Sequence, residues 1–336
     1  MSVTPSRERL FELLQRARGT RICVIGDAML DVYLTGDVER ISPEAHVPVV
    51  RVSGRKHALG GAANVAQNVV AVGASCHLVA SVGDDWAGRT LARMLGEIGS
   101  ESTLLYTNRC TTRKTRIVAR SQQLVRIDEE EDAPLDGADV DRLLGFVRAV
   151  VDSADAVVLE DYNKGVLVPS VIETAIHRAS DRGVPIVVDP KYRNFFAYAG
   201  ATVFKPNRRE LEAALGSAID LAHPTAMPEV LARLGVEHLL LTMGERGMAL
   251  LSRGGAVHRI AGVAREVFDV VGAGDTVTAY VAAVLAAGGR PEEAAAVANI
   301  AAAIEVGKLG AASVSADEVL AFNDRAGPDD SPITSP

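Results

Sequence analysis

Short apolar runs and amphipathic stretches alternate along most of the chain. The first run, Arg21–Gly26, is continuously apolar after its first residue and ends in glycine, which is typical of a buried parallel strand. Comparable runs predict strands at Cys76–Val82, Ala156–Leu159, Pro185–Asp189, Ala201–Phe204 and His238–Thr242. Helical patterns lie between most of these runs, at Ala62–Ala71, Trp86–Ile98, Val140–Val151, Ser170–Arg182 and Pro228–Leu234. This alternation predicts an α/β fold in which helices cover both faces of a mainly parallel sheet.

Two regions depart from this rhythm. Residues 36–57 and 111–128 show short alternating stretches with no helical pattern between them. They predict a small antiparallel sheet at one end of the large sheet. Because only one face of such a sheet packs, we expect a lid over a substrate or the surface of a homodimer. We expect one domain over residues 1–323 and, from its polar and proline-rich composition, a disordered tail over 324–336.

Composition narrows the class of protein. Of the 336 residues 48% are hydrophobic and 23% charged, and the net charge is −8, which disfavours a nucleic-acid partner. The longest apolar run, Ala279–Ala287, is too short to span a bilayer, and the first 21 residues lack the apolar core of a signal peptide. The three cysteines lie far apart, which disfavours a disulfide framework or a zinc site. We therefore expect a cytoplasmic protein with no membrane partner.

The strongest candidate chemistry lies in Phe268–Ala279. Gly272, Ala273 and Gly274 directly precede a helix-forming stretch, and Asp275 falls in its first turn. The free N–H groups at such a helix N-terminus favour an anion. A carboxylate beside them is suited to accept a proton from a hydroxyl group that attacks phosphorus. An ordinary helix cap explains the pattern equally well, so other motifs must decide.

Two further motifs are expected at the same sheet edge. Gly60 and Gly61 open a helix and let the backbone approach a ligand, while Asn64 offers both a donor and an acceptor. Asp27 and Asp31 follow the first strand, where open α/β sheets bind ligands and where carboxylates can accept hydrogen bonds from sugar hydroxyls. A tight turn or a helix cap explains each motif alone, and only their combination favours a sugar site.

Two segments are candidates for a nucleotide site. Asn207 and Glu210 have the spacing of a capping box. Alternatively, Glu210 is a water-mediated ligand of Mg²⁺, which keeps several of its waters in proteins, and Asn207 contacts phosphate or water. A predicted strand ends at Thr242 and enters a turn containing Gly244 and Gly247, which we expect to line nucleotide phosphates.

Together these motifs resemble those of the ribokinase-like (PfkB-type) carbohydrate kinases over roughly residues 21–318. The two signatures are residues 60–64 and 269–276. The resemblance implies a ribokinase-like three-layer α/β/α sandwich with a small antiparallel β lid, and ATP and Mg²⁺ as cofactors. It also implies K⁺ for some members, and Asp269 matches their monovalent-cation loop.

The same resemblance implies the roles of the site residues. Asp275 matches the catalytic base, and Gly272, Ala273 and Gly274 match the anion hole. Asn207 and Glu210 match the element that contacts the nucleotide and Mg²⁺, and Asn299 matches a position near the adenine.

Four segments resemble one subgroup, the D-glycero-D-manno-heptose-7-phosphate kinases of lipopolysaccharide precursor synthesis. They are residues 26–33, 40–45, 111–116 and 122–128. The subgroup implies ATP-dependent phosphorylation of the anomeric hydroxyl, giving heptose 1,7-bisphosphate. Many relatives carry a nucleotidyltransferase domain with a His-x-Gly-His motif. This sequence contains no such motif, so we expect the kinase activity alone.

A basic cluster in the small sheet is a candidate site for the sugar phosphate. Eight consecutive residues of this chain, which is acidic overall, contain four basic ones: Arg113, Lys114, Arg116 and Arg120. Because alternate residues of a strand share a face, Lys114, Arg116 and Arg120 are expected on one side. A charged edge strand that resists aggregation is an equally good explanation.

Three rival functions differ in testable ways. Another sugar kinase of the same fold would prefer a different sugar in a substrate panel. A dinucleotide oxidoreductase is disfavoured because the first strand leads into Gly26-Asp-Ala-Met and not into Gly-x-Gly-x-x-Gly. A non-catalytic sugar sensor is disfavoured because the base, the anion hole and the metal-side glutamate are all present.

Overall fold

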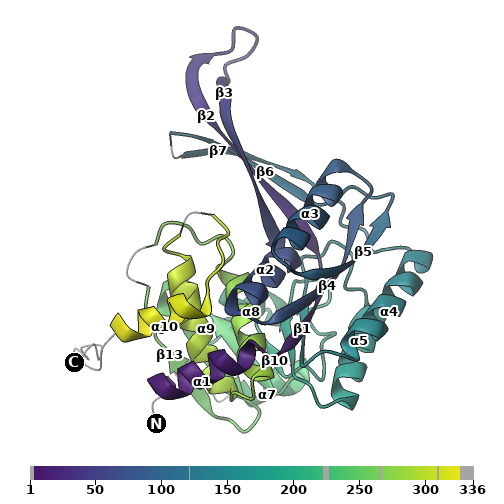
Figure 1. Ribbon diagram of the computed structural model, residues 1–336, viewed down its shortest axis with the longest axis vertical. Helices are drawn as coiled ribbons and strands as arrows, with labels where there is room; N and C mark the ends of the chain where they lie inside the picture. Colours follow the sequence, from purple (N-terminus) through teal and green to yellow (C-terminus); the bar gives the residue numbers. More distant parts are fainter. Residues whose placement is uncertain (1–3, 121, 222–226, 265–266, 309, 326–336) are drawn as a thin grey trace.

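A large sheet and a small sheet form the framework of the molecule (Figure 1). The computed structural model describes residues 4–325 except 121, 222–226, 265–266 and 309. The nine-stranded sheet has the order β13 (Val257–Ile260), β12 (Met248–Ser252), β11 (His238–Thr242), β10 (Val203–Phe204), β9 (Ile186–Asp189), β8 (Ala156–Glu160), β1 (Arg21–Gly26), β4 (Ser75–Gly83) and β5 (Glu101–Thr107). Neighbours pair in parallel from β11 to β5, whereas β12 and β13 are antiparallel.

Helices cover both faces of the large sheet, so the predicted three-layer arrangement is confirmed. One hydrophobic cluster packs α1 (Arg7–Ala17), α2 (Ala62–Val72), α3 (Trp86–Glu97), α8 (Ala273–Ala286), α9 (Pro291–Glu305) and α10 (Ala316–Arg325) on one face. The other cluster packs α4 (Gly137–Val151), α5 (Pro169–Asp181), α6 (Arg208–Leu215) and α7 (Met227–Leu234) on the opposite face. Every predicted strand and helix is present with small shifts at its ends, and the sequence patterns missed β5, β12 and β13.

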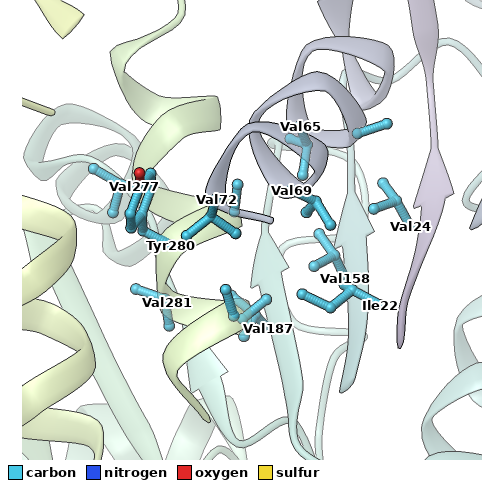
Figure 2. Close-up of a cluster of buried hydrophobic side chains, with 14 of the residues drawn as sticks. Ile22, Val24, Val65, Val69, Val72, Val158, Val187, Val277, Tyr280 and Val281 are labelled. Atoms are coloured by element: carbon cyan, nitrogen blue, oxygen red, sulfur yellow. The ribbon is translucent and has the colours of Figure 1, made fainter. Parts of the chain in front are cut away.

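The central strands are buried on both faces, which explains their continuous apolar runs. In β1, Ile22 and Val24 point into one cluster, and Cys23 and Ile25 point into the other. Figure 2 shows Ile22 and Val24 in the cluster that also contains valines of α2 and α8. Each fully buried side chain of this size contributes about 1.5–3 kcal/mol of transfer free energy. This core fixes the strand ends at which the candidate site lies.

The small sheet has the order β3 (Pro48–Gly61), β2 (Ala28–Ile41), β6 (Arg113–Ala119) and β7 (Gln122–Glu129). The pairs β2–β3 and β6–β7 are antiparallel as predicted. The central pair β2–β6 is parallel, which corrects the prediction of a wholly antiparallel sheet. The reason is that β2 follows β1 and β6 follows β5, and these two parallel strands leave the large sheet in the same direction.

We call this four-stranded sheet the lid. The β2–β3 hairpin projects away from the helices (Figure 1), and its strands begin closer to the large sheet than the predicted residues 36–57. At the other end of the chain, α10 continues to Arg325, within the expected tail. Residues 326–336 lie outside the described part of the chain. In that described part, none of the helices has the length and apolar character needed to cross a membrane.

Candidate functional site

Asp275 lies in the first turn of α8, where the sequence predicted it. Its carboxylate is buried, with 4% of the residue exposed. Tyr162 Oη donates to Oδ1 at 2.9 Å, and Asn64 Nδ2 donates to Oδ2 at 2.8 Å. Burial raises the pKa of Asp275 to about 6, aided by Asp189 and opposed by the hydrogen bond from Asn64. The side chain is therefore oriented by two donors and can exchange a proton near neutral pH.

The turn before Asp275 requires glycine. Gly272 caps α8 with φ 97°, a left-handed conformation that side chains rarely adopt. A Cβ atom there would lie 2.9 Å from Asn64 Nδ2, the group that holds Asp275. The first-turn amides of α8, from Ala273 to Asp275, have no intrahelical acceptor. Gly272, Ala273 and Gly274 therefore form a main-chain cradle for an anion beside the carboxylate.

The paired glycines and Asp31 lie near the start of α2, whose Asn64 donates to Asp275. Gly60 and Gly61 end β3 and lead directly into α2, which carries Asn64. A Cβ atom at Gly60 would lie 2.8 Å from Asp31 Oδ2. Asp31 forms a buried ion pair with Arg116. Burial raises the pKa of Asp31, and the nearby Arg116 opposes this shift.

Asp27 has a different environment from the other predicted sugar contacts. Its Oδ2 accepts hydrogen bonds from the backbone N–H groups of Tyr162 and Lys164, and its Oδ1 accepts one from Val166. Burial raises the pKa of Asp27 to about 6, with a further contribution from Asp161. The observed contacts of Asp27 thus shape the loop that follows β8, and that loop presents Tyr162 to Asp275.

Two functional candidates, Glu160 at the end of β8 and Lys205 after β10, were missed from the sequence, whereas Asp189 was expected to end a strand at this edge of the sheet. Carboxylate oxygens of Glu160, Asp189 and Asp275 lie within 4.8 Å of one another. Lys205 Nζ lies 2.7 Å from Asp189 Oδ2. Burial alone would lower the pKa of Lys205, but Asp189 and Glu160 outweigh it and raise that pKa. Their position in the sequence was the available signal, since Glu160 and Lys205 each directly follow a predicted strand.

Glu160 is unusual among these groups. It is fully buried, and neither carboxylate oxygen has a hydrogen-bond partner within the described structure. Burial and the nearby Asp189 raise its pKa well above the ordinary value. Unpaired carboxylate oxygens are hard donors of the kind that Mg²⁺ prefers.

A cavity of about 560 Å³ adjoins the anion cradle. The predicted nucleotide residues Thr242, Gly244, Gly247 and Asn299 all line it, together with Ala273 and Gly274 and several valines. The turn with Gly244 and Gly247 forms the 3₁₀ helix η2 (Gly244–Arg246) and its C-terminal cap. A largely apolar cavity that ends at an anion cradle is suited to a base and its attached phosphates.

Asn207 and Glu210 form the predicted capping box. Asn207 Oδ1 accepts a hydrogen bond from Glu210 N, and Glu210 Oε2 accepts one from Asn207 N. Lys191 Nζ lies 2.6 Å from Glu210 Oε1. Asn207 also forms a β-bridge with Thr242, which places the box next to the cavity.

Asp269 connects two loops beside α8. Its Oδ1 accepts a hydrogen bond from Val271 N at 3.0 Å, and its Oδ2 accepts one from Gly310 N at 3.2 Å. Nearby Glu305 is buried, and its carboxylate oxygens have no hydrogen-bond partner in the part of the chain described. Burial raises the pKa of Glu305 to about 8, and Asp269 adds to the shift. This environment would favour a cation.

Lys114 and Arg116 share a face of the lid, since their register partners are Asp31 and Tyr33, but Arg113 and Arg120 lie elsewhere. Arg113 lies over the Trp86 ring at 4.7 Å and pairs with Glu129, whereas Arg116 pairs with Asp31. Arg120 is exposed and lies beyond the end of β6, with φ 49°. Its predicted place beside Lys114 and Arg116 is therefore wrong, because strand alternation stops one residue earlier.

Comparisons with known proteins agree with this architecture. The model of the pfkB family carbohydrate kinases matches residues 19–318. The Bifunctional protein HldE of Rhodospirillum rubrum is 45% identical over 325 residues, covering 96% of this chain and 65% of that protein. The protein of the same name from Pelobacter propionicus is 46% identical over 318 residues, covering 94% of this chain and 65% of that protein. The chain thus spans about 65% of the length of these curated relatives.

Solved structures show the same fold at lower identity. Arabidopsis thaliana ribokinase complexed with ribose and ATP gives a TM-score of 0.71 at 20% identity, over 90% of this chain and 98% of that one. Escherichia coli phosphofructokinase-2 in complex with potassium gives a TM-score of 0.77 at 17% identity, over 91% of this chain and 99% of that one. Since the family model covers most of the chain, this protein belongs to the pfkB family of carbohydrate kinases.

Proposed function

We propose that this chain is the kinase that transfers the γ-phosphoryl group of ATP to the anomeric hydroxyl of D-glycero-D-manno-heptose 7-phosphate. The observation that carries this proposal is the position of Asp275. It lies in the first turn of α8 next to Gly274, which lines the cavity, and its carboxylate accepts a hydrogen bond from Asn64 of α2. The sugar assignment rests on the four segments that resemble the heptose-phosphate kinases. The product, heptose 1,7-bisphosphate, would serve ADP-heptose synthesis for the lipopolysaccharide inner core.

The proposed reaction is a direct in-line transfer. The anomeric oxygen forms a bond to the γ-phosphorus, the bond from that phosphorus to the β–γ bridging oxygen breaks, and the hydroxyl proton passes to Asp275. Asn64 and Tyr162 hold the carboxylate in position through their hydrogen bonds. The main-chain amides of the cradle stabilise the charge that develops on the transferred group. A base with a pKa of about 6 is ionised at pH 7 and can still accept a proton.

The donor set fits a hydrated Mg²⁺ ion. Glu160 offers unpaired carboxylate oxygens beside Asp189, and Glu210 pairs with Lys191, on which the charges of Asp189 and Glu160 also act. We propose that these three carboxylates hold Mg²⁺ through water. Bound Mg²⁺ would neutralise charge on the phosphate oxygens. Lys191 and Lys205 supply two further positive charges on the nucleotide side.

A monovalent cation such as K⁺ is proposed for the loop at Asp269. The unpaired buried carboxylate of Glu305 is the observation that supports it. The amide donors that hold Asp269 keep the loop beside Gly272, where a bound charge would help to order the cradle.

We also propose a cytoplasmic homodimer formed through the lid. β7 is exposed along its whole length. Leu124, Val125 and Ile127 are each exposed by about two fifths or more of their surface. Apolar side chains gathered on one projecting sheet are typical of an association surface.

ADP release with a panel of acceptors tests the proposed activity. We expect turnover with heptose 7-phosphate and at least about tenfold lower kcat/KM with free heptose, fructose 6-phosphate, ribose or a nucleoside. NMR of the product should show a new phosphate on the anomeric oxygen. A preference for a hexose phosphate or a nucleoside, or phosphorylation at another oxygen, would contradict the proposal.

A further inference from the structure

Two lysines from different parts of the molecule converge on one glutamate at the base of the lid. Lys114 Nζ lies 3.2 Å from Glu130 Oε2, and Lys164 Nζ lies 2.9 Å from Glu130 Oε1. Both side chains are largely buried, with 17% and 13% exposed. A second carboxylate accompanies each lysine, Asp128 for Lys114 and Asp132 for Lys164. Glu130 thus bridges two positive charges that the fold brings together.

The lysine pair lies on the sugar side of the site. Lys114 is in register with Asp31 across the parallel β2–β6 pair, so both side chains lie on the same face of the lid. Lys164 follows Tyr162 by two residues, and Tyr162 Oη donates to Asp275. The backbone N–H groups of both Tyr162 and Lys164 donate to Asp27, which fixes this segment. One short loop therefore carries a contact to the catalytic carboxylate and a charge near the lid.

The cavity that Lys164 lines is small. A cavity lined by Lys164, Arg109 and Thr112 has a volume of about 20 Å³. That volume accommodates about one water molecule and is too small for a phosphate group. This cavity therefore cannot hold the phosphate, whereas the carboxylate of Glu130 already occupies an anion position at Lys164.

We propose that Lys114 and Lys164 bind the phosphate group at the far end of the sugar substrate, and that this phosphate displaces Glu130. This inference rests on the proposed function and adds the residues that select a phosphorylated sugar. A phosphate carries more negative charge than a carboxylate and offers three acceptor oxygens. Glu130 is 25% exposed, which gives its carboxylate a route into solvent.

The arrangement links recognition to the position of the lid. Lys114 belongs to β6 of the lid, whereas Lys164 belongs to the loop after β8. A phosphate held by both lysines joins these two parts directly. Glu130 makes the same link when the substrate is absent, so the site exchanges one bridging anion for another.

The test compares phosphorylated and free heptose as substrates of lysine variants. For Lys164→Gln and Lys114→Gln we expect kcat/KM on heptose 7-phosphate to fall at least about tenfold, mainly through KM. The rate with free heptose should stay within about threefold of the wild type, so the preference for the phosphorylated sugar shrinks. Arg55→Gln is the matched control, because Arg55 is an exposed cation on β3 whose register partner is Leu34. Its preference should equal that of the wild type.

Glu130→Gln provides a second readout that a merely structural role would not give. Removing the competing carboxylate should lower KM for heptose 7-phosphate by about threefold. An unchanged preference in both lysine variants, or a raised KM in Glu130→Gln, would overturn the inference. Failure of the wild-type protein to phosphorylate heptose 7-phosphate would instead overturn the proposed function, so the two failures are distinguishable.

Discussion

The two ends of the proposed substrate site are built in different ways. At the catalytic end, Asp275 is buried in the first turn of α8 and held by Asn64 and Tyr162. At the lid end, Lys114 on β6 and Lys164 in the loop after β8 are held by partly exposed carboxylates such as Glu130. The proposed base is therefore held by two hydrogen-bond donors at the buried start of a helix, whereas the proposed phosphate contacts are ion pairs that can exchange partners.

The largest effect is expected at the rigid end. Asp275→Asn preserves shape but removes the base, so we expect kcat to fall by at least about 100-fold. The raised pKa of Asp275 shows that burial disfavours its charged form. The variant should therefore be at least as stable as the wild type. Steady-state ADP release and thermal unfolding measure the two quantities, and a variant with near wild-type turnover would remove Asp275 from the mechanism.

The pH dependence of kcat/KM should show an effect of intermediate size, caused by the carboxylate of Asp275. The base must be ionised, and its pKa is about 6, so kcat/KM should decline about tenfold for each pH unit below that value. The contribution of Asp275 to stability changes with pH in the opposite direction. The folded pKa exceeds the ordinary 3.8, so the contribution of this group to stability is complete below that value and is lost as the pH rises through about 6.

The control for this profile is the residual activity of Asp275→Asn. Ionisation of the substrate phosphates affects both proteins, whereas ionisation of Asp275 affects only the wild type. A matching acidic limb in the variant would show that another group titrates.

The smallest effect is expected at Arg113 in the lid. Arg113 lies over Trp86 and pairs with the half-exposed Glu129, a surface contact worth about 1 kcal/mol or less. Arg113→Ala should lower the melting temperature slightly and change kcat/KM on heptose 7-phosphate by less than about threefold. A loss comparable with that of Lys164→Gln would show that Arg113 also binds the substrate phosphate.

The candidate site was partly predictable because its main-chain features leave a trace in the sequence. Gly60, Gly61 and Gly272 precede helices, Gly274 lies in the first turn of α8, and Asn64 and Asp275 follow these glycines at short spacing. Glu160 and Lys205 leave no comparable trace, since a polar residue after a strand is ordinary. Their importance comes from burial and from neighbours on other strands. Arg120 was misplaced because the end of β6 is decided by its pairing with β7.

The sequence by itself determined the α/β alternation, the glycine turns and the acidic residue that follows them, because these depend on local periodicity and backbone freedom. Tertiary structure alone decided the parallel β2–β6 pair, the carboxylates at the ends of β8 and β9, and the meeting of Lys114 with Lys164. These contacts join segments far apart in the chain, and their geometry depends on how the strands order themselves in the sheets.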